Sequence, residues 1–369
     1  MLKKDFWYDL PKELIAQEPA DPRDAARLMV LDRKNDKILH SVFHELPHYL
    51  EKGDLLVVNN SKVLPARLMG TKVPTGAVCE LLLLRQVKGD QWECLAKPGK
   101  RMQPGTKVSF GDGSLTAVVD ETMEDGNKYV TFYYDTETLY EKLDEFGKMP
   151  LPPYITKQLE DQSQYQTVYA MKEEHSAAAP TAGLHFTSEL MAAIEAKGAK
   201  FAAVELEVGI DTFRLVEEDD PTQHVMHTER YHVSQEVVDA VHKAKAEGHR
   251  VIAVGTTAVR SLESAFDAEA PVFDPAVTAR YFEGREDGAD TLGRGDIVVR
   301  ENATTQLYLM PGSTYHVVDA LITNFHVPRS TLMMLVSALA TRDQIMDAYA
   351  AAIEERYRFF SFGDAMLIQ

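Results

Sequence analysis

The chain has 369 residues, of which 45% are hydrophobic and 26% are charged, and its formal net charge is −18. These proportions indicate a globular protein of about two domains and exclude a disordered one. No apolar run approaches the roughly 20 residues that cross a bilayer, and the first residues lack the hydrophobic stretch of a secretion signal. Only two cysteines are present, Cys79 and Cys94, which predicts a cytoplasmic protein without a disulfide framework.

The negative charge argues against a nucleic-acid partner, because a phosphate-binding surface is normally basic. Acidic residues are nevertheless concentrated locally, in residues 217–220 and 283–296. A basic groove elsewhere on the molecule therefore stays open, since net charge does not decide what one cleft binds.

The first two regions of the chain differ in texture. Residues 1–64 are expected to form the first part of an α/β domain, with a buried strand in Asp54–Asn60 that leads into a functional loop. Residues 65–149 hold short apolar or alternating runs separated by turn residues, which predicts a small inserted antiparallel β-barrel. Its five expected strands are Cys79–Leu84, Gln91–Ala96, Lys107–Phe110, Leu115–Val119 and Lys128–Tyr134.

Residues 150–369 are expected to form the second part of the α/β domain. Strands are predicted over Phe201–Val208 and Val251–Val254, because both runs are short and apolar. Helices alternate with them, and this alternation favours parallel pairing. The predicted helices are Thr187–Lys197, Ser234–Glu247, one that begins near Ala258, Ser330–Leu339 and Arg342–Arg358.

Polar residues follow the strand Val251–Val254. Thr256 and Thr257 come directly after Gly255, and Arg260 lies in the helix that follows. Ligands of open α/β sheets bind at the carboxyl ends of strands, and a helix N-terminus attracts anions. The threonines can equally be helix caps without a ligand.

A small-residue turn over 176–187 carries Thr181, Gly183 and His185. Such a turn packs tightly against a flat ligand beside a titratable imidazole, or it is a structural turn with a core histidine. Further along, Glu207, Asp211 and Arg214 lie near the end of a predicted strand. Carboxylates there act as bases or hold ribose hydroxyls, unless the strand end is simply solvated.

Three more segments place polar or aromatic side chains in series. In 319–330, Asn324 and His326 flank Phe325, which stacks on a base or packs in the core. His227 belongs to an H-x-x-H-x-E string, for which a substrate contact is favoured over a metal site, unless the string is simply a solvated surface. The C-terminal segment with Tyr357, Arg358 and Asp364 forms a stacking wall or a docked tail.

The residues alone therefore predict an α/β enzyme with a polar, aromatic cleft suited to a nucleoside, and no dedicated metal. The sequence contains no P-loop, no dinucleotide-binding glycine motif, no nucleophile elbow and no kinase signature. The reaction lies beyond that argument.

Eight strings in fixed order make the set far more specific than any member. They are Leu14–Gln17, Arg27–Val30, Pro65–Leu68, Tyr165–Ala170, Ala178–Thr187, Gly255–Ser264, Thr323–Leu332 and Tyr357–Ile368. Over nearly its whole length the chain resembles the S-adenosylmethionine:tRNA ribosyltransferase-isomerases of queuosine biosynthesis.

The resemblance implies a fold, a reaction and partners. The fold is a barrel-like α/β main domain with an inserted β-barrel. S-adenosylmethionine, as co-substrate, donates its ribosyl moiety, which is isomerised onto 7-aminomethyl-7-deazaguanine at the wobble position of a tRNA anticodon. The product is epoxyqueuosine, and adenine and methionine are released. No metal is expected, and the protein is expected to be a monomer.

The same reaction suggests roles for the residues named above. The sulfonium acidifies the neighbouring 5′ carbon and adenine leaves more easily when protonated, so His185 or His326 is expected to handle protons. Glu207 and Asp211 are expected to face the ribose or the sulfonium. Other residues are expected to bind S-adenosylmethionine, with the first three on its carboxylate or on a phosphate: Thr256, Thr257, Arg260, Thr181, Gly183, Asn324 and Phe325.

A last set is expected to contact the tRNA or its modified base: Asn60, Lys62, Arg67, Arg214, His227, Tyr357, Arg358 and Asp364. At some site positions the chain departs from the family pattern. Asn60 stands where the family has an acid, Lys62 where it has arginine, Glu207 where it has histidine and Asp211 where it has glycine. These departures leave open a diverged paralogue, either a non-catalytic RNA-binding module or an S-adenosylmethionine or nucleoside enzyme that acts on a small molecule.

Overall fold

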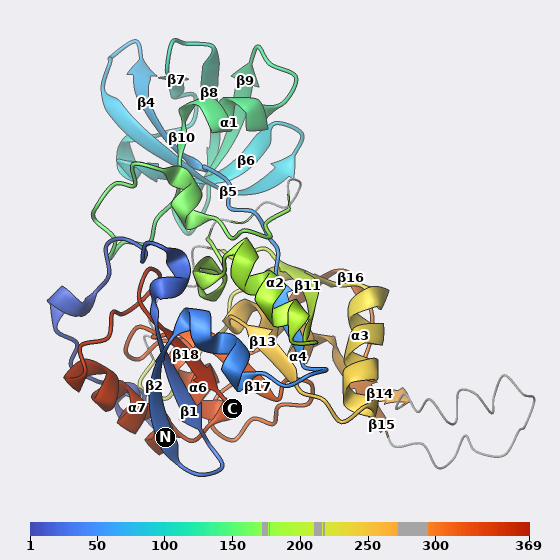
Figure 1. Cartoon of the computed structure of the whole chain (residues 1–369). Coiled ribbons are helices and arrows are strands. Elements are labelled where there is room, and N and C mark those ends of the chain that lie inside the picture. The colour runs from blue at the N-terminus through green and yellow to red at the C-terminus, as the bar shows by residue number, and fades with distance from the viewer. Residues whose placement is uncertain (172–175, 177, 210–215, 217, 272–293) are drawn as a thin grey trace, which may run out of the picture.

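Nine strands form the central sheet of the larger part of the molecule, in the order β16-β12-β11-β3-β13-β17-β18-β1-β2 (Figure 1). The computed structural model describes residues 1–171, 176, 178–209, 216, 218–271 and 294–369. The strands are β1 Arg27–Asp32, β2 Lys37–Val42, β3 Leu55–Asn59, β11 Lys200–Leu206, β12 Glu229–Val233, β13 Val251–Val254, β16 Arg300–Thr305, β17 Ala320–Asn324 and β18 Ala365–Ile368. The four central strands β11, β3, β13 and β17 pair in parallel, as the alternation of elements predicts.

Helices cover both faces of this sheet. They are α2 Ser188–Ala196, α3 Gln235–Ala246, α4 Thr256–Ala265, α6 Thr331–Leu339 and α7 Arg342–Glu354. In β3, Leu55 and Val57 pack in the core with α3, α4, α6 and α7, whereas Leu56 and Val58 pack on the other face with α2. Side chains of a strand alternate between faces, so a strand buried on both sides is apolar throughout. This explains the continuous apolar runs of the sequence.

Hydroxyl side chains fix where the helices begin. The Thr187 hydroxyl accepts from the Leu190 amide at 3.1 Å, and the Ser330 hydroxyl accepts from the Met333 amide at 3.2 Å. Ser234 caps α3 in the same way. Each bond satisfies an amide that has no partner within its helix, and the predicted helix starts are confirmed.

The smaller part is a closed antiparallel barrel of six strands, because β4 pairs with both β5 and β7. Its elements are β4 Arg67–Val73, β5 Val78–Lys88, β6 Gln91–Lys97, β7 Lys107–Phe110, β8 Leu115–Thr122, β9 Lys128–Tyr134, the helix α1 Leu139–Phe146 and the short β10 Gly147–Lys148, which extends β4. The barrel has a buried core of its own. The expected fold class, an α/β protein with an inserted small antiparallel barrel, is confirmed.

Three barrel elements escaped prediction, among them the two-residue β10. Strand β4 contains Gly70 and three polar residues and so lacks a clear alternating pattern. Helix α1 has only eight residues, and a capping box between Thr138 and Glu141 starts it. We propose the boundaries 1–64, 65–149 and 150–369 for the domains, because the barrel strands run from Arg67 to Lys148.

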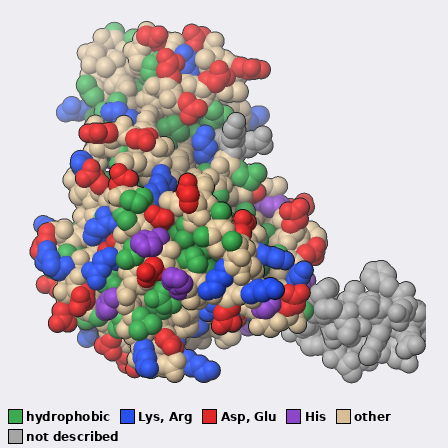
Figure 2. Space-filling view, in the orientation of Figure 1, with side chains coloured by type: hydrophobic (Ala, Val, Ile, Leu, Met, Phe, Trp, Pro, Cys, Tyr) green, Lys and Arg blue, Asp and Glu red, His purple; other side chains and the backbone are tan. Residues whose placement is uncertain are grey.

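Charges of both signs are interspersed on the face seen in Figure 2, over the barrel as well as the larger part. A separate hairpin of β14 Phe266–Pro271 and β15 Arg294–Ile297 lies beside α3 (Figure 1). None of the helices in the described ranges combines the length and the hydrophobicity that crossing a bilayer requires.

Candidate active site

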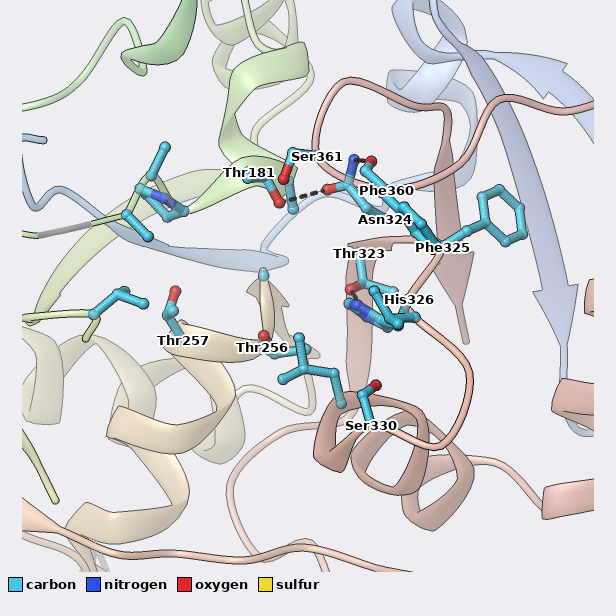
Figure 3. Close-up of a pocket in the computed structure, with 18 of the residues that line it drawn as sticks. Thr181, Thr256, Thr257, Thr323, Asn324, Phe325, His326, Ser330, Phe360 and Ser361 are labelled. Atoms are coloured by element: carbon cyan, nitrogen blue, oxygen red, sulfur yellow. Dashed lines mark hydrogen bonds between the residues drawn. The ribbon is translucent and has the colours of Figure 1, made fainter. Parts of the chain in front are cut away.

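A cavity lies where β13 and β17 end (Figure 3). Four segments that are far apart in the chain line it: residues 178–182, 255–257, 323–327 and 360–361. Because β13 and β17 are parallel neighbours, their carboxyl ends meet at the same edge of the sheet. This is the place where α/β sheets bind ligands. The structure therefore brings together four of the segments that the sequence singled out.

Gly255 makes the turn from β13 into α4. Its φ of +88° lies in the region that side chains other than glycine rarely adopt, and its amide donates to the Ile322 carbonyl at 2.8 Å. Helix α4 then begins without a side-chain cap, with Thr256 and Thr257 on the cavity wall. The buried Thr257 hydroxyl has no hydrogen-bond partner among the described residues. This wall thus offers unsatisfied polar groups to a ligand.

The side chain of Asn324 is held on all sides at the end of β17. Its Nδ2 donates to His185 Nε2 at 3.2 Å and to the Phe360 carbonyl at 3.1 Å, and its Oδ1 accepts from the Thr181 hydroxyl at 3.2 Å. Figure 3 shows the bonds to Thr181 and Phe360 at the rim of the cavity. Asn324 joins three lining segments into one rigid wall.

His185 lies behind this wall and does not line the cavity. It is 4% exposed, and its ring packs against Phe43 at 5.0 Å between ring centroids. Burial, together with the positive charges of Arg358 and Arg23, lowers the pKa of His185 to about 3. A neutral imidazole that accepts from Asn324 supports a positioning role, while the proton-handling role stays a prediction.

His326 does line the cavity, and its Nε2 lies 2.8 Å from the Thr323 hydroxyl. Its backbone amide donates to the Tyr349 hydroxyl at 2.8 Å, which fixes the segment after β17. Burial lowers the pKa of His326 to about 3. The imidazole is therefore neutral near pH 7.

The lining carries hydroxyls, amides and apolar groups, and no Asp, Glu, Lys or Arg is among the described residues that form it. With His326 neutral, this wall does not repel a cation and does not demand an anion. The surface suits a polar, uncharged ligand with an aromatic base or a single positive centre.

Phe325, expected to stack on a base, turns its ring away from the cavity (Figure 3). The ring is fully buried against Tyr349, at 5.3 Å, and Phe359, at 4.9 Å between centroids. Phe325 and Phe360 both border the cavity, and the Phe360 ring lies 4.8 Å from the ring of Tyr154 between centroids. Sequence reasoning missed Phe360, Tyr154 and Ser361, although the string Tyr357–Ile368 contains two of them.

Phe360 adopts a φ of +71°, which is rare for a bulky residue. Its amide donates to the Phe325 carbonyl at 3.2 Å, and its carbonyl accepts from Asn324. Strained backbone that surrounding bonds enforce is concentrated at functional sites. Tyr154 donates to or accepts from the Ser361 hydroxyl at 2.7 Å, and burial raises the pKa of Tyr154 to about 12.

Three other predicted residues of the C-terminal segment make structural contacts. The Asp364 carboxylate is buried and accepts from the amides of Arg27, at 3.0 Å, and Arg358, at 2.7 Å. The Arg358 guanidinium also lies 3.3 Å from Asp364. Tyr357 is fully buried, with its hydroxyl 2.8 Å from His40 Nδ1. These three residues are thus docked on the core, whereas Phe360 and Ser361 of the same segment line the cavity.

Arg260 and His227 lie together at a second, smaller cavity. Both are bonded to the buried Glu229: Arg260 Nη1 donates to one oxygen, and His227 Nε2 lies 2.9 Å from the other. His224 pairs with Glu218 at 2.9 Å instead. The histidines of the H-x-x-H-x-E string are therefore divided between two pairs, and the described ranges contain no group of three metal-ligating side chains.

The remaining predicted residues lie on the side of the barrel. Asn60 Nδ2 contacts the Met171 sulfur at 2.8 Å, and Arg67 Nε lies 3.8 Å from Glu80 at the start of β4. Glu207 is exposed. Burial raises the pKa of the Tyr140 hydroxyl on α1, and the negative charge of Glu207 also raises it. Lys62, two residues after Asn60, is half-buried. Asp211 and Arg214 lie outside the described residues.

Gly183 does not line the cavity. A glycine is required at this position because neighbouring side chains pack closely against its backbone. A Cβ there would lie 1.9 Å from the Tyr169 hydroxyl and 2.8 Å from Thr167 Cγ2. Only glycine admits this approach of the 167–169 segment.

The chain is similar to known proteins over its whole length. The profile of a family described as "Queuosine biosynthesis protein" matches residues 3–368. The S-adenosylmethionine:tRNA ribosyltransferase-isomerase of Symbiobacterium thermophilum is 50% identical over all of both chains. The enzyme of that name from Lachnoclostridium phytofermentans is 48% identical over all of this chain and 97% of its own. The crystal structure of S-adenosylmethionine tRNA ribosyltransferase from Thermotoga maritima has a TM-score of 0.51 and 38% identity, over 99% of this chain and 100% of that one.

Proposed function

Because the chain belongs to the queuosine biosynthesis protein family, we propose that it is an S-adenosylmethionine:tRNA ribosyltransferase-isomerase. It transfers and isomerises the ribosyl moiety of S-adenosylmethionine onto 7-aminomethyl-7-deazaguanine in the wobble position of a tRNA. Epoxyqueuosine-tRNA, adenine and methionine are the products. The observation that carries this proposal is the meeting of four distant family segments at one uncharged cavity.

The cavity suits the adenosine part of S-adenosylmethionine. Thr181, Thr257 and Ser361 offer hydroxyl groups for polar edges of the base and the ribose, and Phe360 offers an aromatic face. The neutral wall also tolerates the sulfonium, since a positive residue there would repel it.

His326 is the histidine on the cavity wall and the residue we place closest to the chemistry. In its neutral form it can accept a proton, which the reaction requires at the carbon beside the sulfonium. An imidazole with a pKa of about 3 is a weak base, so most of the acidity must come from the sulfonium itself. Thr323, at 2.8 Å, orients the ring.

The tRNA side of the site is proposed on the flank of the barrel. Asn60 and Lys62 lie between β3 and β4, and Arg67 begins β4, where the chain leaves the main sheet for the barrel. Lys62 and Arg67 supply positive charge there in spite of the overall −18. We expect a cytoplasmic monomer, in line with two buried free cysteines.

The test is adenine release, measured with S-adenosylmethionine and tRNA that carries 7-aminomethyl-7-deazaguanine. Adenine that appears only with the modified tRNA supports the proposal. tRNA binding without adenine indicates an RNA-binding module, and adenine without any RNA indicates an enzyme that acts on a small molecule. His326→Ala is expected to lower the rate in the first case and leave tRNA binding unchanged.

A further inference from the structure

Arg260 on α4 is only 5% exposed, yet two of its three guanidinium nitrogens have no hydrogen-bond partner among the described residues. Its Nη1 donates to the Glu229 carboxylate. Its Nε and Nη2 are buried and make no hydrogen bond with any described residue. Buried donors without acceptors are costly and rare in proteins. Their presence points to a ligand that supplies the acceptors.

The geometry of these two nitrogens defines the ligand. Nε and Nη2 lie on one edge of the planar guanidinium and direct parallel N–H groups, which match the two oxygens of a carboxylate. Because Glu229 occupies only Nη1, this edge remains available. Arg260 lines a small cavity together with His227 and Tyr308.

Apart from Thr331, the rest of this cavity is apolar. Met226, Leu307, Leu309 and Leu335 line it. Leu332 lines both this cavity and the main one, so the two are neighbours. A short aliphatic chain can pass along such a wall, whereas a phosphate of an RNA backbone lies on a bulky, solvated polymer.

Helix α4 links the two cavities. Thr256 and Thr257 line the main cavity (Figure 3), and Arg260 follows one turn later, a rise of about 5 Å. Thr257, whose hydroxyl has no partner among the described residues, lies between Thr256 and Arg260 in the sequence of this helix. A ligand whose nucleoside occupies the main cavity can thus reach Arg260 with a chain of a few carbon atoms.

We infer that the cavity beside Arg260 binds the α-carboxylate of the methionine part of S-adenosylmethionine, bidentate on Nε and Nη2, with the aliphatic carbons against the leucines. This assignment rests on the proposed function, because it assumes that S-adenosylmethionine occupies the main cavity. It makes Arg260 the residue that distinguishes the amino-acid end of the co-substrate.

The test compares the dissociation constants of S-adenosylmethionine and its decarboxylated analogue, by calorimetry without tRNA. The wild-type protein is expected to bind S-adenosylmethionine roughly ten- to a hundredfold more tightly. Arg260→Lys keeps the charge beside Glu229 but removes the fork, and is expected to reduce this ratio to about threefold or less. Arg342→Lys, on α7, is the matched control and should keep the wild-type ratio.

Equal affinities of the two compounds for the wild-type protein overturn the assignment, and this comparison needs no folded variant. An unchanged affinity ratio of the two compounds in Arg260→Lys overturns the assignment as well. If Arg260→Lys instead weakens only the binding of tRNA, the anion at Arg260 is an RNA phosphate, and the assignment is also overturned. Adenine release with modified tRNA is scored separately. If the wild-type protein discriminates the carboxylate but releases no adenine, the proposed function fails and the carboxylate site stands.

Discussion

Asn324 Nδ2 and His185 Nε2 are joined by a hydrogen bond of 3.2 Å behind the wall of the main cavity. The donor is the amide, so the bonded imidazole nitrogen carries no proton and Nδ1 carries it. Through the same amide, His185 is connected to the Phe360 carbonyl, and through Oδ1 to Thr181. The histidine thus acts on the cavity through Asn324.

Substitution of His185 tests this positioning role. His185→Gln keeps an acceptor near the position of Nε2 and is expected to retain much of the adenine-release rate. His185→Ala leaves Asn324 without that acceptor, and we expect a roughly ten- to hundredfold lower rate because the wall loses its alignment. Steady-state rates measured as a function of pH check this. Equal loss in both variants, together with the disappearance of one limb of the pH profile, indicates proton transfer by His185 instead.

The two buried histidines predict loss of stability in acid. Burial lowers the pKa of both His185 and His326 from 6.5 to about 3, so below pH 6.5 the unfolded chain binds protons that the native state does not. The free energy of unfolding therefore falls as the pH decreases from about 6.5 towards 3, by up to roughly 1.4 kcal/mol per pH unit and histidine. Urea unfolding near pH 7 and near pH 5 measures the slope.

His185→Gln and His326→Asn should each remove about one proton from this dependence. His44, which is exposed, supplies the control, and His44→Gln should leave the slope as in the wild type. A slope that neither buried substitution changes would contradict the burial of these rings.

Gly183→Ala is expected to destabilise the protein through one contact. The new methyl would lie 1.9 Å from the Tyr169 hydroxyl, and overpacking of a core costs about 1–3 kcal/mol. The Tyr169 hydroxyl is buried without a partner among the described residues, so Tyr169→Phe alone should change stability little. The double variant should recover part of the loss, since Thr167 still lies close. Thermal unfolding of the four proteins forms the double-mutant cycle.

Phe360 and Phe325 are adjacent in space but face different surroundings, which gives a matched pair of variants. Phe360→Leu removes the aromatic face from the cavity and is expected to weaken S-adenosylmethionine binding about three- to tenfold. Phe325→Leu opens space in the aromatic core and should instead lower the free energy of unfolding by roughly 1–3 kcal/mol, with binding little changed. Calorimetry and urea unfolding of both variants decide. Weaker binding in Phe325→Leu alone would assign the stacking face to Phe325 after all.

Local rules made much of the fold readable from the sequence. Ser330 and Thr187 predict the starts of their helices, because a capping hydroxyl accepts a hydrogen bond from an amide only a few residues away. The apolar run before Asn60 predicts strand β3, because a strand that is buried on both faces contains few polar residues. Strand β4 was not predicted, because its pairing with β5 and β7 stabilises it and its own short sequence has no clear alternation of apolar and polar residues.

The site divides in the same way. The sequence by itself singled out four segments that line the main cavity, since strands that end in Thr, Asn or His place polar groups at the edge of a sheet. Only the tertiary structure decided which side chain of each segment reaches the cavity. His185 and Phe325 are turned into the core while Phe360 and Thr257 face the ligand space, and Arg260 is left with an open edge beside Glu229. The physical reason is that burial and hydrogen-bond completion depend on partners more than a hundred residues away, such as His185 for Asn324, which no local pattern records.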